Sequence, residues 1–135
     1  MCWALYLASD FEIPRIPWDD TTRRLALLPL AASNDVILAK FSVPNVAYVC
    51  SHNGCGCGFM DDSESCGDGR RLRLSVLGEL HELLASMGAI GAKIEMFLCW
   101  EGDQGRPIDA EIRLSPGDFL DATFPLEAQQ FAVIK

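Results

Sequence analysis

The chain has 135 residues, half of them hydrophobic, and its formal net charge is −8 at pH 7. A chain of this length is expected to form a single domain, residues 1–135, with a core that needs no disulfides. The acidic charge argues against a nucleic-acid partner. No apolar run is long enough to span a membrane, and the short apolar start lacks the basic residues of a signal peptide. We therefore expect a cytoplasmic protein that does not contact a membrane.

The first third of the chain predicts short elements. Residues 2–8 alternate in the manner of a β-strand, and a polar segment containing Pro14 and Pro17 follows. Residues 24–30 favour a second short strand, whereas residues 33–41 fit either a strand or a short helix, which we prefer. Residues 46–51 are β-branched and aromatic between turn residues, a composition that predicts a buried strand.

The clearest element lies in the second half, where apolar residues recur at spacings of three and four over 72–87 and predict an amphipathic helix. Strands are predicted at 93–101 and 109–114, joined by a glycine-containing turn as a hairpin. A short helix is expected around 119–122, and residues 129–134 fit a last edge strand. The predicted fold is α+β, with a mixed sheet of four or five strands and one principal helix packed on one face.

A glycine–cysteine loop follows the strand at 46–51. Cys55 and Cys57 alternate in it with Gly54, Gly56 and Gly58, and His52 comes just before. Glycine lets the backbone turn tightly, and successive N–H groups in such a turn can converge on a thiolate. Two thiolates held close together suit a soft metal or thiol–disulfide exchange. The alternative is a tight turn whose cysteines pack as small apolar side chains.

The predicted topology brings further cysteines to this loop. The strand at 46–51, the helix and the strand at 93–101 form a β-α-β unit, whose strands are parallel, so Cys55, Cys57 and Cys99 should meet at one edge of the sheet. An antiparallel first strand would bring Cys2 to the same edge. Side-chain alternation places Cys2 and Cys99 on one face. We therefore predict a cluster of these four cysteines, with Cys66 apart from it.

Four segments of the sequence resemble a small bacterial protein family. They are Met-Cys-x-x-Leu-Tyr-x-Ala-Ser-Asp at the start, Phe-x-x-Pro-Asn-Val from Phe41, Ser-His-x-Gly-Cys-Gly-Cys-Gly-Phe from Ser51, and Cys-Trp-x-Gly-Asp from Cys99. The resemblance covers most of the chain, and the Gly-Cys-Gly-Cys-Gly-Phe run is its most specific part. It implies that Cys2, Cys55, Cys57 and Cys99 belong to the family pattern and that Cys50 and Cys66 do not. That family has no established activity, so the resemblance implies no reaction.

Three functions are compatible with these observations. The first is a metal site, most simply zinc, with Cys2, Cys55, Cys57 and Cys99 as ligands and His52 as a substitute; an iron–sulfur cluster would use the same ligands. The second is a thiol or redox enzyme with Cys55 or Cys57 as nucleophile and His52 as base. The third is a non-catalytic interaction module. Whether the protein is an enzyme, and which protein partner it has, the sequence leaves open.

Overall fold

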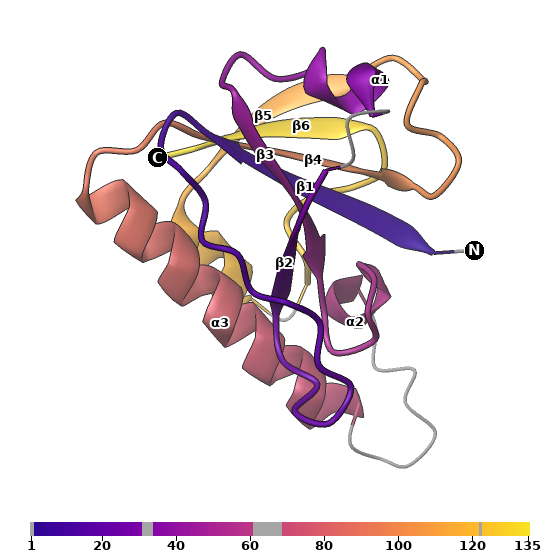
Figure 1. The fold of residues 1–135 in the computed structure, drawn as a ribbon, viewed down its shortest axis with the longest axis vertical. Helices are drawn as coiled ribbons and strands as arrows, with labels where there is room; N and C mark the ends of the chain where they lie inside the picture. The colour runs from indigo at the N-terminus through magenta and orange to yellow at the C-terminus, as the bar shows by residue number, and fades with distance from the viewer. Residues whose placement is uncertain (1, 31–33, 61–68, 122) are drawn as a thin grey trace.

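The computed structural model describes residues 2–30, 34–60, 69–121 and 123–135. Its strands are β1 (Trp3–Ser9), β2 (Ala26–Pro29), β3 (Asn45–Cys50), β4 (Ile94–Trp100), β5 (Ala110–Leu114) and β6 (Gln130–Ile134). Its helices are α1 (Asp35–Leu38), α2 (Cys57–Met60), α3 (Gly69–Ala89) and the 3-10 helix η1 (Pro116–Leu120). The strands form one six-stranded mixed sheet in the order β2-β3-β1-β4-β6-β5 (Figure 1). The α+β class is confirmed, with one strand more than the upper predicted number.

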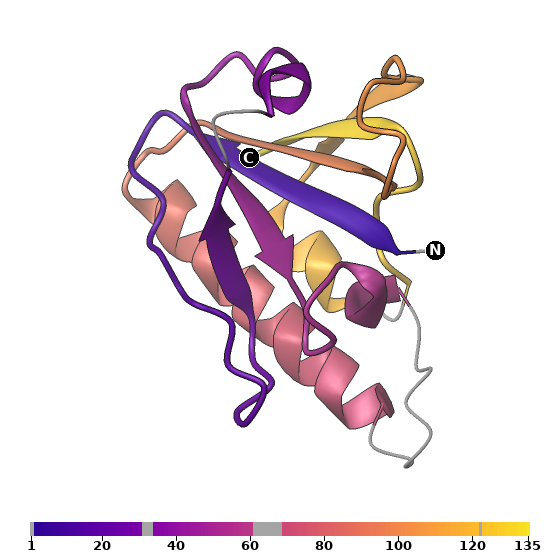
Figure 2. The same ribbon diagram turned by 45° about the vertical axis from the view of Figure 1, so that its right-hand side comes forward.

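Helix α3 is the principal helix and lies across one face of the sheet (Figure 2). The predicted stripe is confirmed, because its central residues Val76, Leu80 and Leu84 are buried in an apolar cluster with side chains of β1 and β4. Burial of such a stripe, more than intrinsic propensity, is what stabilises a helix in a folded protein. Within the described parts of the chain, no helix combines the length and apolar character needed to cross a membrane.

The predicted β-α-β unit is confirmed, with β1 inserted between its two strands. Strands β3 and β4 each pair with β1 in antiparallel fashion, so they run parallel to one another. Side-chain alternation is also as predicted: Leu5 and Leu98 face α3, whereas Phe97 and Cys99 face the opposite side. The ends of β3 and β4 therefore lie at the same edge of the sheet as the start of β1.

One predicted strand pairing and one predicted strand position are wrong. Strands β4 and β5 do not form a hairpin, because β6 lies between them, antiparallel to β4 and parallel to β5. Strand β6 is therefore internal, and β5 is the edge strand. The cause is side-chain burial: Phe131, Ala132 and Ile134 of β6 are buried across both faces, whereas β5 leaves Glu111 and Arg113 in solvent. A strand buried on both faces belongs inside a sheet.

The face opposite α3 has a thinner cover. Ile37 of α1 and the following residues Phe41 and Val43 pack against Phe97 and Phe131 of the sheet. The short helix preferred for residues 33–41 is thus confirmed over Asp35–Leu38.

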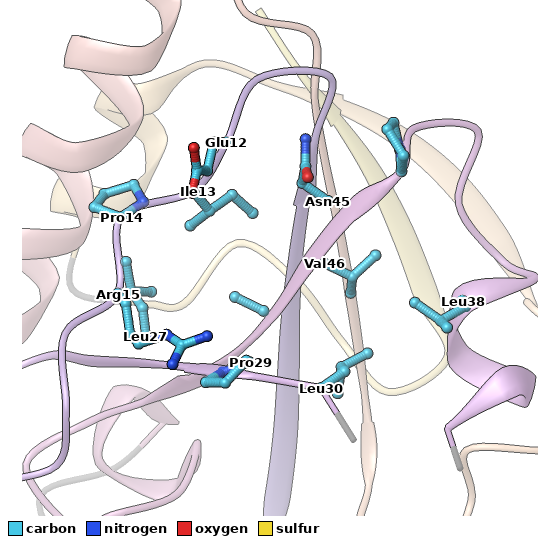
Figure 3. Close-up of a pocket in the computed structure, with 12 residues that line it drawn as sticks. Glu12, Ile13, Pro14, Arg15, Leu27, Pro29, Leu30, Leu38, Asn45 and Val46 are labelled. Atoms are coloured by element: carbon cyan, nitrogen blue, oxygen red, sulfur yellow. The ribbon is translucent and has the colours of Figure 1, made fainter. Parts of the chain in front are cut away.

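An open cavity of about 620 Å³ lies beside the end of β2 (Figure 3). Strand β2 stops at Pro29, which pairs with Ala47, and the chain then leaves the sheet. Arg15 from the segment before β2, Val46 of β3 and Leu38 of α1 line the opening. None of the described cysteines lines it, so this cavity is separate from the glycine–cysteine loop.

Candidate metal centre

The loop after β3 is closed by Ser51. The backbone N–H and the hydroxyl of Ser51 both donate to the carbonyl of Cys55, at 2.8 and 2.6 Å. The hydroxyl oxygen accepts from the N–H of Gly58 at 3.0 Å, and the Ser51 carbonyl accepts from Gly54 at 3.0 Å. Ser51 is fully buried. The sequence showed it only as part of a motif, although a serine directly before a glycine-rich turn is typical of residues that bond to the local backbone.

Glycine is required at three positions of the loop. Gly54 has φ of 78°, which only glycine adopts without strain. A Cβ on Gly56 would lie 2.8 Å from the backbone oxygen of Trp3, and a Cβ on Gly58 would lie 2.6 Å from the ring of His52. Glycine therefore alternates with cysteine because neighbouring groups lie too close to Gly56 and Gly58 to leave room for a side chain.

The start of β1 is tied directly to this loop. Gly56 N–H donates to the carbonyl of Trp3 at 2.9 Å, and Trp3 N–H donates to the sulfur of Cys57 at 3.3 Å. On the other side, Glu101 N–H donates to the carbonyl of Cys2 at 2.8 Å. These bonds hold Cys2 next to the loop.

Three sulfur atoms meet as a result. The Sγ atoms of Cys2, Cys55 and Cys57, called here the three-sulfur cluster, all lie within 4.8 Å of one another, close enough to hold a metal ion. Cys2 is exposed, and Cys55 and Cys57 are half-buried. The cluster is thus reachable from solvent, while its loop is fixed by backbone hydrogen bonds.

The electrostatics of the cluster favour an added cation. Burial raises the pKa of Cys55 well above its ordinary value; the N–H of Cys57 lowers it, and the neighbouring thiols of Cys57 and Cys2 raise it again. A second negative charge beside the first is unfavourable without a counter-ion. A bound cation reverses this balance, because a coordinating thiol is deprotonated.

His52 and Cys99 are not in the three-sulfur cluster. His52 is buried, its ring packs against Gly58, and its carbonyl accepts from Arg23 Nε at 3.3 Å. Cys99 is fully buried in the apolar cluster opposite α3, because side-chain alternation on β4 turns it away from the loop. Burial, followed by the charges of Glu101 and Asp103, raises the pKa of Cys99 to about 12.

The remaining cysteines divide between the core and the part of the chain not described. Cys50, at the end of β3, is buried, and burial raises its pKa to about 11. Cys66, which we predicted to lie apart from the cluster, is outside the described residues. The structure therefore brings together three of the four cysteines that the sequence predicted.

Comparisons of the chain with protein-family models, with curated proteins and with solved structures found no match. The resemblance to a bacterial family stays a prediction, and the geometry of the three-sulfur cluster is what indicates a function.

Proposed function

We propose that this protein binds a thiophilic metal ion of the zinc type through Cys2, Cys55 and Cys57. The observation that carries the proposal is the separation of their sulfurs, all within 4.8 Å of one another although Cys2 is distant in sequence from the other two. Zinc holds thiolates at about 2.3 Å, which sets sulfur atoms roughly 4 Å apart around it. Small side-chain rotations would bring the three sulfurs to that geometry.

The protein supplies more than ligands. The N–H of Trp3 points at the sulfur of Cys57, and such a donor stabilises a thiolate and orients it toward a metal. Because the described residues contribute three sulfurs to this cluster, a water molecule or another donor would complete a tetrahedral set. A bound ion would also link the start of β1 to the loop after β3, and so add to the stability of this edge.

The redox alternative has weaker support. A reactive thiol needs a lowered pKa, so that the thiolate is present at neutral pH. Burial and the neighbouring thiols instead raise the pKa of Cys55. Reduced thiols are typical of the cytoplasm, so we propose a cytoplasmic location together with the metal site.

Metal analysis of the purified protein, combined with zinc titration, tests the proposal. Wild type should bind one zinc ion per chain, and Cys55→Ala should weaken binding at least about 100-fold, because a thiolate ligand is lost. Cys99→Ala is the matched control, since it removes a thiol of the opposite face and should leave zinc affinity unchanged. A count of reactive thiols should fall by three when zinc is added, one for each sulfur of the cluster.

Two results would refute the metal site. Zinc affinity in Cys55→Ala equal to that of wild type would place the ion elsewhere. Wild-type protein that takes up no zinc, cobalt or iron under reducing conditions would leave the interaction module as the better hypothesis.

A further inference from the structure

A row of aromatic side chains crosses the face of the sheet opposite α3. The pairing registers place Tyr48, Tyr6, Phe97 and Phe131 side by side on four neighbouring strands, with Leu28 beyond Tyr48. Phe41 covers Phe131. The two tyrosines instead border a cavity of about 430 Å³, a size typical of sites for small molecules.

One ring of this row, that of Phe97, already has a cation over its face. The ammonium group of Lys40 lies 5.1 Å from the centre of the Phe97 ring, and it donates to the carbonyl of Arg106 at 2.7 Å. An ammonium over an aromatic face is attracted by the ring's quadrupole. The next ring along the row, that of Tyr6, borders the cavity.

The cavity also contains an oriented carboxylate. Gln104 Nε2 donates to Glu101 Oε1 at 2.6 Å and to the hydroxyl of Tyr6 at 3.2 Å, while Gly102 N–H fixes the other end of the amide at 2.8 Å. The hydroxyl of Tyr48 donates to Glu101 Oε2 at 3.3 Å. Both side-chain donors are neutral, so they orient the carboxylate without cancelling its charge.

Two cations, Arg106 and Lys40, are engaged with other partners. Arg106, in the same loop, pairs with Asp103 at 3.4 Å, and Lys40 is held over Phe97. Burial, followed by the charge of Glu101, strongly raises the pKa of Tyr48. The two rings meet edge to face, with centroids 5.5 Å apart, so the cavity combines aromatic walls with an anionic side.

We propose that this cavity binds a small primary alkylamine as its ammonium form, with Glu101 as counter-ion and the rings of Tyr6 and Tyr48 as the walls. A guanidinium fits less well, because bidentate pairing needs both carboxylate oxygens and Gln104 occupies Oε1 at short distance. A compact ammonium needs one oxygen for its charge and can donate its other protons to the Tyr48 hydroxyl oxygen or to Asn34 at the rim. The described residues that line this cavity include none of the three cysteines of the three-sulfur cluster.

NMR titration of the full chain with n-butylammonium chloride at constant ionic strength tests this site. We expect saturable shifts of the Gln104 side-chain amide and of the Tyr6 and Tyr48 signals. Glu101→Gln should weaken binding at least tenfold, whereas Glu111→Gln, which neutralises an exposed carboxylate of β5, should not change it. Tyr48→Leu removes one ring and should weaken binding at least threefold. If one of these two variants fails to fold, the other still tests the site. Cys55→Ala should bind the amine with wild-type affinity, which separates this result from that of the metal titration.

Two control ligands define the chemical class of the bound molecule. Neutral n-butanol should give no saturable shifts in the same concentration range, and n-butyltrimethylammonium should bind at least threefold more weakly, because it has no N–H donors. Equal binding of butanol, or an unchanged affinity in Glu101→Gln, would overturn the site. Equal or tighter binding of the trimethylated amine would overturn its assignment to primary amines.

Discussion

The two faces of the sheet differ in cover and in chemistry. The α3 face lies under α3, η1 and the buried Phe59 of α2, which form the larger of the two apolar clusters with it. The opposite face is covered by α1 and the residues after it, and it places Glu95, Tyr6 and Cys99 among apolar neighbours. Because most of the apolar burial is on one side, the fold depends mainly on the α3 face, and the other face carries polar groups at lower cost.

The cysteines divide along the same line. The loop with Cys57 continues into α2, whose Phe59 is buried in the α3-face cluster, whereas Cys99 belongs to the other face. Both lie toward the same edge of the sheet, because the ends of β3 and β4 are there. Two cysteines at the same edge of the sheet therefore share a site only if they also lie on the same face.

Truncating a core side chain of α3 should give the largest change in stability. Leu80 is fully buried at the centre of the α3-face cluster, and Leu80→Ala should lower the free energy of unfolding by about 2–5 kcal/mol through lost burial and a residual cavity. Leu74→Ala is the control on the same helix, since Leu74 is 44% exposed, and it should cost less than about 0.5 kcal/mol. Chemical denaturation measures both. A loss below about 1 kcal/mol for Leu80→Ala would show that the α3 face does not dominate stability.

Local patterns predicted the α3 face well. Helix α3 follows from apolar spacing, and the inward residues of β1 and β4 follow from strict alternation, because both signals are set by residues close in sequence. They also placed Cys2 beside Cys55 and Cys57, once β1 was taken as antiparallel.

Strand neighbours and the position of Cys99 required information that is not local. A hairpin between β4 and β5 is the shortest connection, yet β6 replaces β5 next to β4 because it is apolar on both faces. That signal was present in the run Phe131-Ala132-Val133-Ile134, compared with the charged alternation of β5. For Cys99, alternation placed the side chain on the correct face, but nothing in the sequence showed that the loop closes on the other side.

A methyl group added inside the loop should disturb the three-sulfur cluster. In Gly56→Ala the new Cβ would lie 2.8 Å from the carbonyl oxygen of Trp3, so the loop and the start of β1 must separate. We expect a loss of about 1–3 kcal/mol in the free energy of unfolding, together with weaker zinc binding. Denaturation and zinc titration measure the two effects. Unchanged zinc affinity would mean that the cluster does not depend on the contact between the loop and β1.

The polar groups of the opposite face should respond less. Ser42 donates its N–H to Glu95 at 2.8 Å and its hydroxyl at 2.5 Å, and Glu95 is 3% exposed. Ser42→Ala removes one of these two donors, but Ser42 itself is exposed, so water can replace the hydroxyl in part. We expect a cost of about 1 kcal/mol in chemical denaturation. A cost above about 3 kcal/mol would show that this face is sealed as tightly as the α3 face.

The smallest effect should have the opposite sign. Gly78 lies inside α3, and among the described residues no heavy atom beyond its own helix lies within 4 Å of the position of an added Cβ. Gly78→Ala should therefore raise the free energy of unfolding by about 0.5–1 kcal/mol, because alanine loses less backbone entropy in a helix and clashes with nothing. The same substitution at Gly56 is its matched opposite, since there the backbone of Trp3 fills the space. If both variants were destabilised, glycine would be required in α3 for a contact outside those described. If both were stabilised, the close approach between the loop and β1 would not persist in solution. The three sulfurs would then lose the constraint that holds them together.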